Sequence, residues 1–236
     1  EMYVIEKRSR MTFSLDRVEF RAMLDKSLDL IIGGLKFKYQ DKRLSMRKLH
    51  IEQRKASLDL TKPFSLKIES ITFKNDNHKP RKNTGKPNRG WFDQGHLDMV
   101  VSMEATVNYL SKDSLYAQVT HLELLDKPSD WDIRHFSTFI NRSGKRLTAT
   151  SIFVAMKRTR VRINKVDIDI PGVQVYDFPL EADVYLQDLA KPFATPLSHF
   201  TTPLKLNVVC GGDIDRYLFK NILVTTPDNR LRITGE

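Results

Sequence analysis

The chain has 236 residues, 40% of them hydrophobic, which is enough for one sizeable domain or two small ones. Its 10 glycines and 10 prolines exclude collagen-like and low-complexity classes, and its formal charge of +10 raises an anionic partner as a hypothesis. With the single cysteine Cys210 no disulfide can form within the chain, and no apolar run reaches the roughly eighteen residues of a membrane span.

Alternation of apolar and polar residues with a period of two begins early and predicts β-strands with one apolar face. The first series runs on both sides of the Gly33-Gly34 pair and continues through several short strands. Its apolar members are Leu28, Leu30, Ile32, Leu35, Phe37, Tyr39, Leu49, Ile51, Leu58, Leu60, Phe64, Leu66 and Ile68.

The longest series lies in the middle of the chain and is broken only by Val100. Its apolar members are Leu97, Met99, Val101, Met103, Ala105, Val107 and Tyr109. Strands usually have about five or six residues, so this pattern predicts an unusually long one. In the next series Leu122 and Leu124 follow Val119 with a slip of one position, which predicts a β-bulge.

The second half of the chain repeats the pattern between turn signals such as Gly211-Gly212-Asp213. The apolar members are Val161, Ile163, Val166, Ile168, Ile170, Leu180, Ala182, Val184, Leu186, Leu204, Leu206, Val208, Ile222, Val224, Leu231 and Ile233. The spacing predicts a mostly β fold, a long antiparallel meander joined by hairpins. Short helices are predicted around Val18–Lys26 and Leu189–Phe200.

We expect residues 1–236 to form one continuous β-rich segment of a longer protein, because both ends of the sequence look cut. One apolar face of such a sheet needs a cover. Three architectures are possible: a second sheet packs on this face, the sheet closes on itself as a barrel, or a curved sheet stays open as a groove. The period-two pattern does not distinguish between them.

A basic stretch interrupts the strands. Between Asp76 and Asp93 there is no acidic residue, and the segment carries Lys79, Arg81, Lys82, Lys86 and Arg89 together with prolines and glycines. This composition predicts a mobile, solvated loop over residues 75–90. The alternative is that this loop contacts anionic headgroups or nucleic acid, and we favour the solvated loop over it.

No catalytic motif is present. The six histidines lack metal-ligand spacings, one cysteine cannot build a Cys–His cluster, and no nucleophile elbow, P-loop or dinucleotide fingerprint occurs. We expect no enzyme activity, no metal and no cofactor. Aromatic residues make up 9% of the chain and do not interleave with the basic runs, so no nucleic acid is expected as a partner.

Three segments resemble AsmA-like proteins of Gram-negative bacteria. They are RGWFDQGHLD at 89–98 with SKDSL at 111–115, LAKPFATPLSHF at 189–200 with TPLKL at 202–206, and the strand-turn-strand ending at 219–233 that contains TPDNRL. Together these segments cover about half of the chain, and the N-terminal part is similar only in its style of strands and turns.

The resemblance implies a periplasmic segment of a protein anchored in the inner membrane by a helix that this chain lacks. Family members are similar to bridge-like lipid transfer proteins, in which repeated strands form a curved apolar groove. The implied function is non-catalytic: shielding phospholipid acyl chains on their way to the outer membrane, in outer membrane biogenesis. The alternative is a structural or binding β-sandwich of the cell envelope without a lipid cavity.

Strand geometry then selects the groove-lining candidates, because alternate residues of one strand share a face. We expect the apolar members of the longest runs to face the concave side. These candidates are Leu97, Met99, Val101, Met103, Val107, Tyr109, Leu180, Val184 and Leu186.

Overall fold

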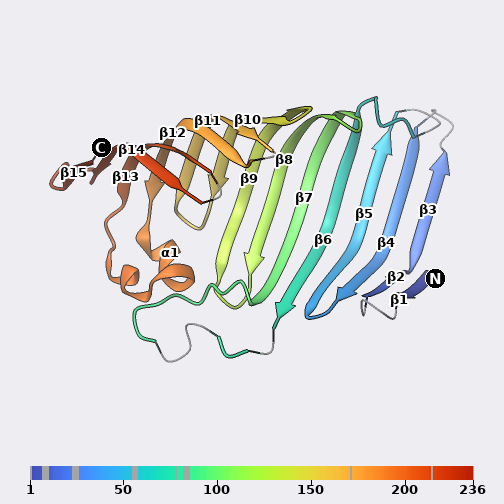
Figure 1. Ribbon diagram of the computed structural model, residues 1–236, viewed down its shortest axis with the longest axis horizontal. Coiled ribbons are helices and arrows are strands. Elements are labelled where there is room, and N and C mark those ends of the chain that lie inside the picture. The colour runs from blue at the N-terminus through green and yellow to red at the C-terminus, as the bar shows by residue number, and fades with distance from the viewer. Residues whose placement is uncertain are drawn as a thin grey trace.

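The computed structural model describes residues 2–6, 11–22, 27–54, 58–77, 79–81, 86–170, 172–213 and 215–235 (Figure 1). Its strands join into one antiparallel sheet of 15 strands, accompanied in the described residues by one α-helix and one 3-10 helix. The predicted mostly β antiparallel meander is therefore confirmed.

The strands follow one another across the sheet in nearly sequential order. They are β1 (Met2–Glu6), β2 (Met11–Leu15), β3 (Arg17–Ala22), β4 (Leu28–Tyr39), β5 (Lys42–Gln53), β6 (Phe64–Asp76), β7 (His96–Leu110), β8 (Ser114–Asp126), β9 (Trp131–Ser143), β10 (Arg146–Ala155), β11 (Arg160–Asp169), β12 (Gln174–Val184), β13 (Leu204–Gly212), β14 (Tyr217–Thr225) and β15 (Arg232–Gly235). The helices α1 (Leu186–Phe193) and η1 (Thr195–His199) lie between β12 and β13.

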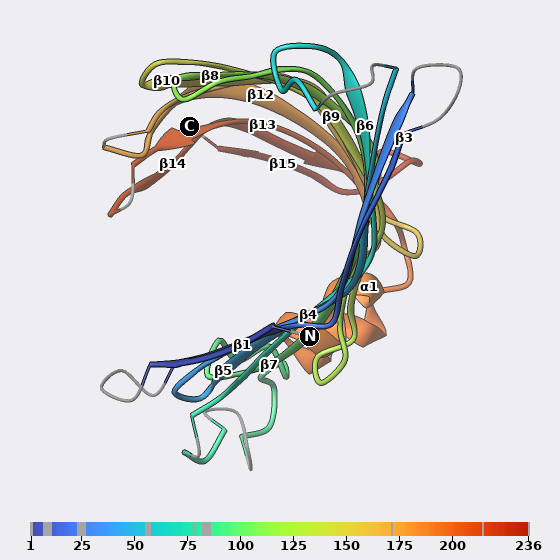
Figure 2. The same cartoon turned by 90° about the vertical axis from the view of Figure 1, so that its right-hand side faces the viewer.

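The sheet is a single curved layer. Figure 2 shows that the strands bend, so the sheet has an open C-shaped profile, and Figure 1 places the two chain ends at opposite ends of the sheet. Register shifts occur in several neighbouring pairs, among them β6–β7, β7–β8 and β8–β9. Bulges of this kind bend strands and increase their twist, which explains the curvature. The slip predicted between Val119 and Leu122 is one of them.

One edge of the sheet is divided. Both β2 and β3 pair with β4, and they are separated by Asp16 opposite Gly34. Gly34 has φ +69°, and a β-carbon there would lie 2.0 Å from the Asp16 Oδ2 atom. Glycine is required here for both reasons, since it allows positive φ and leaves room for the Asp16 side chain.

Two helix predictions are corrected. Val18 and Phe20, predicted in a helix, belong to strand β3 and pair with Ile32 and Leu30, so pairing with β4 decides their conformation. Residues 23–26 lie outside the described residues. The predicted helix at Leu189–Phe200 exists but begins earlier, at Leu186, and splits into α1 and η1 near Ala194.

The predicted basic loop is shorter than 75–90, because Asn75 and Asp76 are the last residues of β6. Positions 78 and 82–85 lie outside the described residues. Its far end is attached to α1: the N–H groups of Gly90, Trp91 and Phe92 donate to the carbonyls of Phe193 (2.8 Å), Lys191 (2.8 Å) and Pro192 (2.9 Å). Figure 1 shows the part of this connection that joins β7 lying beside α1.

Candidate functional site

A continuous row of apolar residues crosses the sheet from β3 to β15. Each member is the register partner of the next one, so the row runs perpendicular to the strands. In order, the members are Val18, Ile32, Leu49, Ile68, Met103, Leu122, Phe136, Val154, Val161, Ala182, Leu206, Val224 and Ile233. We call the side of the sheet that carries this row the apolar face.

A second row runs beside the first on the same face. Its members are Phe64, Val107, Ala117, Ile140, Ala149 and Val166, again paired one to the next. Phe64, Val107 and Ala117 form a buried cluster against which Ile51 and Leu110 pack. The apolar face is therefore a surface several residues wide that extends over most of the sheet.

Several side chains on the apolar face are buried although every described strand belongs to one sheet. Phe64, Val107 and Ala117 are 5%, 8% and 5% exposed. In a single layer only neighbours on the same face can cover them, and curvature crowds side chains on the inner side of a bend. We therefore assign the apolar face to the inner side of the C-shaped sheet (Figure 2).

The opposite face, the polar face, carries cross-strand ion pairs. Lys67 lies 2.6 Å from Glu104 between β6 and β7, and Lys220 lies 2.6 Å from Asp177. Such pairs suit a solvated surface, where each contributes little to stability. The separation of apolar and charged residues onto two faces is what a sheet with one wet and one dry side requires.

Among the described carboxylates of the polar face, Asp167 has the largest pKa shift. It accepts hydrogen bonds or ion pairs from Lys165 (2.8 Å), Thr148 (2.6 Å) and Arg146 (3.2 Å). The Lys165 contact, followed by that of Thr148, lowers the pKa of this carboxyl from an ordinary 3.8 to about 2. Asp167 is therefore ionised throughout the physiological range.

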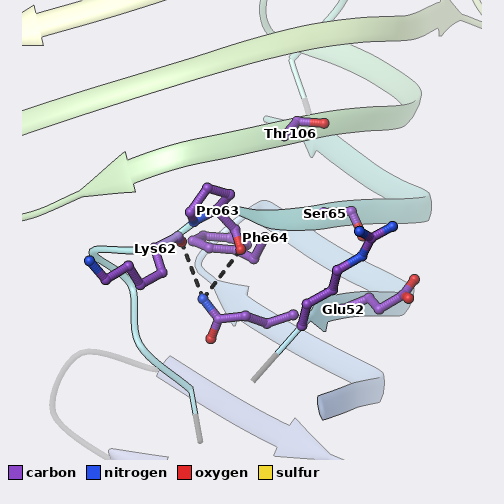
Figure 3. A pocket seen from close by; sticks show the side chains of 8 residues that line it. Glu52, Lys62, Pro63, Phe64, Ser65 and Thr106 are labelled. Atoms are coloured by element: carbon purple, nitrogen blue, oxygen red, sulfur yellow. Dashed lines mark hydrogen bonds between the residues drawn. The ribbon is translucent and has the colours of Figure 1, made fainter. Parts of the chain in front are cut away.

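A pocket of about 560 Å³ lies where β5 ends and β6 begins, lined among others by Lys62, Phe64 and Thr106 (Figure 3). Beside it Gln53, which is 2% exposed, holds the β5–β6 connection. Its Nε2 donates to the carbonyls of Asp59 (2.7 Å) and Lys62 (3.2 Å), and its Oε1 accepts from the Asp59 N–H (2.8 Å). Gln53 is the last residue of β5, and its hydrogen-bonded amide fixes the β5–β6 connection at this end of the apolar face.

The structure brings most of the predicted site residues together. In β7, Val101, Met103 and Val107 pair with Ile71, Ile68 and Phe64, and Leu97 and Met99 continue the same alternation. In β12, Leu180 pairs with Ile163 and Val208, and Val184 pairs with Leu204.

Two of the predicted residues are corrected. A register shift between Val107 and Tyr109 turns Tyr109 to the polar face, where it pairs with Tyr116 and is 40% exposed. Leu110 packs on the apolar cluster in its place. Leu186 is not in a strand, because β12 ends at Val184 and Leu186 begins α1.

The alternation of apolar and polar residues in the sequence did not predict strands β9 and β10. They supply Phe136 and Val154 to the first row and Ile140 and Ala149 to the second. Their alternation is interrupted by register shifts and by the buried Thr138, which stands where an apolar residue is expected. The turn signal Asn141-Arg142-Ser143-Gly144 was the available clue that a hairpin centres there.

Cys210 also lies on the apolar face, opposite Phe178 and Phe219. It is a free thiol, and burial raises its pKa. This environment is that of a structural rather than a reactive cysteine. Among the described residues no group of three metal-ligating side chains gathers.

Comparisons with protein-family models, curated proteins and solved structures found no match for this chain. Within the described residues, no helix is long and apolar enough to cross a membrane.

Proposed function

We propose that this chain is a non-catalytic lipid-shielding segment, whose apolar face covers phospholipid acyl chains while their headgroups remain in water. The observation that carries the proposal is the uninterrupted apolar row from Val18 to Ile233 on one face of a curved single-layer sheet, the face that we assign to its inner side. An apolar surface of this extent is unusual for a protein that works alone, and it marks a surface that is covered in function.

The energetics favour chains that lie along the face without a specific site. Each methylene removed from water contributes about 0.8 kcal/mol, so a chain needs only part of the face to be retained. The first row consists of aliphatic residues, one methionine and one phenylalanine, and none of its members is charged. Such a lining is expected to discriminate little between acyl chains and to let them slide.

The resemblance to AsmA-like proteins supplies the proposed context: the periplasm, with the parent protein anchored in the inner membrane, and lipid passing to the outer membrane. The alternative β-sandwich requires a second sheet over the apolar face. All strands of the described residues belong to one sheet, which favours an external cover over an internal one.

The test is direct. The purified chain is extracted with organic solvent and the extract is analysed by mass spectrometry, and the delipidated chain is titrated with a fluorescent phospholipid. We expect co-purified phospholipid and saturable binding of the probe. A chain that is folded, carries no lipid and binds no probe would defeat the proposal.

A further inference from the structure

Besides the apolar face, the described surface exposes aromatic and basic residues on two segments joined by backbone hydrogen bonds, α1–η1 and residues 86–92. Trp91, Phe193 and Phe200 are 46%, 47% and 57% exposed. Lys86, Arg89 and Lys191 are exposed as well. We call these six residues the docking patch.

The docking patch is held by backbone and ring contacts. The Trp91 N–H donates to the Lys191 carbonyl at 2.8 Å, and the Gly90 N–H donates to the Phe193 carbonyl at 2.8 Å. Phe92 stacks edge-on against Trp131 with ring centroids 5.1 Å apart, and Phe193 lies 5.8 Å from Trp131. These rings anchor the junction to β9, so the exposed aromatics are presented from a supported surface.

A second set of bonds fixes α1 to the sheet. Asp188 Oδ2 accepts from the backbone N–H groups of Arg158 (2.8 Å) and Thr159 (2.7 Å), in the β10–β11 connection. Pro192 and Ala190 form the buried side of α1. The helix therefore cannot turn its exposed residues inward without losing these contacts.

The chemistry of the docking patch matches an anionic bilayer surface. Exposed tryptophan and phenylalanine side chains partition into the interface between headgroups and acyl chains. Basic residues beside them are attracted to anionic headgroups, at about 1 kcal/mol each. Near the patch, the carboxylate of Asp130 lies 3.0 Å from Lys157 but 4.0 Å from Lys191, so Lys157 is its nearer partner.

We propose that the docking patch binds the surface of membranes that contain anionic phospholipid. This contact goes beyond the shielding of acyl chains, because it uses a different part of the molecule and a whole bilayer as the partner. It would hold this part of the protein at a membrane surface.

The test measures flotation of the full chain with vesicles of phosphatidylcholine, with and without phosphatidylglycerol. We expect binding to the phosphatidylglycerol vesicles only, and weakening as salt is raised. Lys86→Gln and Arg89→Gln should each weaken binding about fivefold, the equivalent of one basic residue at the surface. The double variant Trp91→Ser/Phe200→Ser should weaken binding even at low salt.

Two controls separate the patch from other effects. Tyr116→Ser removes an aromatic residue of similar exposure, 45%, from the polar face and should bind vesicles like the wild type. Met103→Glu, on the apolar face, should also bind vesicles normally, so failure of acyl-chain shielding and failure of docking give different results.

Circular dichroism and thermal melting establish that each variant is folded before it is compared. The proposal is overturned if folded Trp91→Ser/Phe200→Ser binds phosphatidylglycerol vesicles like the wild type. It is also overturned if the wild type ignores these vesicles yet binds a single-stranded oligonucleotide through Lys86 and Arg89, since the patch would then serve a polyanion and not a bilayer.

Discussion

Gly90 and Pro192 lie so close together that a β-carbon at position 90 would be 2.1 Å from the Pro192 carbonyl oxygen. The neighbouring atom is backbone in a proline-containing helix, so it cannot move aside as a flexible side chain would. The contact between the β6–β7 connection and α1 therefore depends on glycine at this position.

Gly90→Ala should lower the free energy of unfolding by about 1–3 kcal/mol, because overpacking displaces one of the two backbones. Denaturant unfolding measures the change. Gly172→Ala is the matched control, since an added β-carbon there meets nothing within 4 Å. Equal stability of the two variants would show that the contact at Gly90 is loose.

Gln53→Glu tests the rim of the apolar face. The substitution keeps an oxygen to accept from the Asp59 N–H but removes the amide donor that serves the carbonyls of Asp59 and Lys62. A buried carboxylate facing carbonyl oxygens should lower the free energy of unfolding by about 2–4 kcal/mol. Thermal unfolding provides the measurement, and the exposed Gln94→Glu should leave the midpoint nearly unchanged.

Asp167 gives the protein an acid-sensitive contribution to stability. Because its folded-state pKa is lowered from 3.8 to about 2, its ionised form stabilises the fold above pH 3.8. That contribution is lost as the pH falls through about 2. Wild-type protein should therefore lose more unfolding free energy between about pH 5 and pH 2 than Asp167→Asn does.

Urea denaturation at several pH values checks this difference, with Asp113→Asn in the exposed β7–β8 turn as the control. The control should follow the wild-type pH dependence. Parallel curves for the wild type and Asp167→Asn would mean that the contacts with Lys165, Thr148 and Arg146 form equally well with a protonated carboxyl.

The sequence predicted the fold class because alternation is a local signal that survives without tertiary information. It also predicted the β7 candidates from Leu97 to Val107, where the alternation is regular. It failed at Tyr109, because both Tyr109 and Leu110 are apolar and the strand's own pattern therefore does not show the register shift between Val107 and Tyr109. It failed at Val18 and Phe20 because their alternation lasts only a few residues, and pairing with β4 decided their conformation.

The docking patch could not be predicted for a different reason. Trp91 and Lys191 are far apart in the sequence. They come together because the β6–β7 connection is hydrogen-bonded to α1. The basic stretch itself was visible in the sequence. Its attachment to α1 was not, because backbone hydrogen bonds in irregular segments have no periodic pattern.

Cys210 is a built-in reporter for occupancy of the apolar face. Lipid lying between Phe178 and Phe219 should cover the thiol and slow its reaction with a maleimide at least several-fold. The reaction is followed by mass spectrometry on delipidated protein with and without phospholipid. Since burial raises the pKa of the thiol, the assay is run at mildly alkaline pH. An unchanged rate at saturating lipid would place the lipid elsewhere.

Met103→Glu places a carboxylate in the middle of the apolar row, between Ile68 and Leu122. An acyl chain crossing this position would have to desolvate the charge or leave a gap. Displacing about two methylenes, each worth about 0.8 kcal/mol, should weaken phospholipid binding about tenfold. Titration with a fluorescent phospholipid measures this, and Gln118→Glu on the polar face of neighbouring β8 should bind like the wild type.

Stability distinguishes an open face from a covered one. On an open face the new carboxylate stays hydrated when lipid is absent, so Met103→Glu should reduce the free energy of unfolding by less than about 2 kcal/mol. Under a permanent protein cover the same charge is buried without a partner, and the loss is expected to exceed about 3 kcal/mol. A folded variant with weakened lipid binding is the outcome that the curved single-layer sheet predicts. An unfolded variant, from a wild type that never carried lipid, would instead place Met103 in a packed interior and remove the basis for lipid shielding.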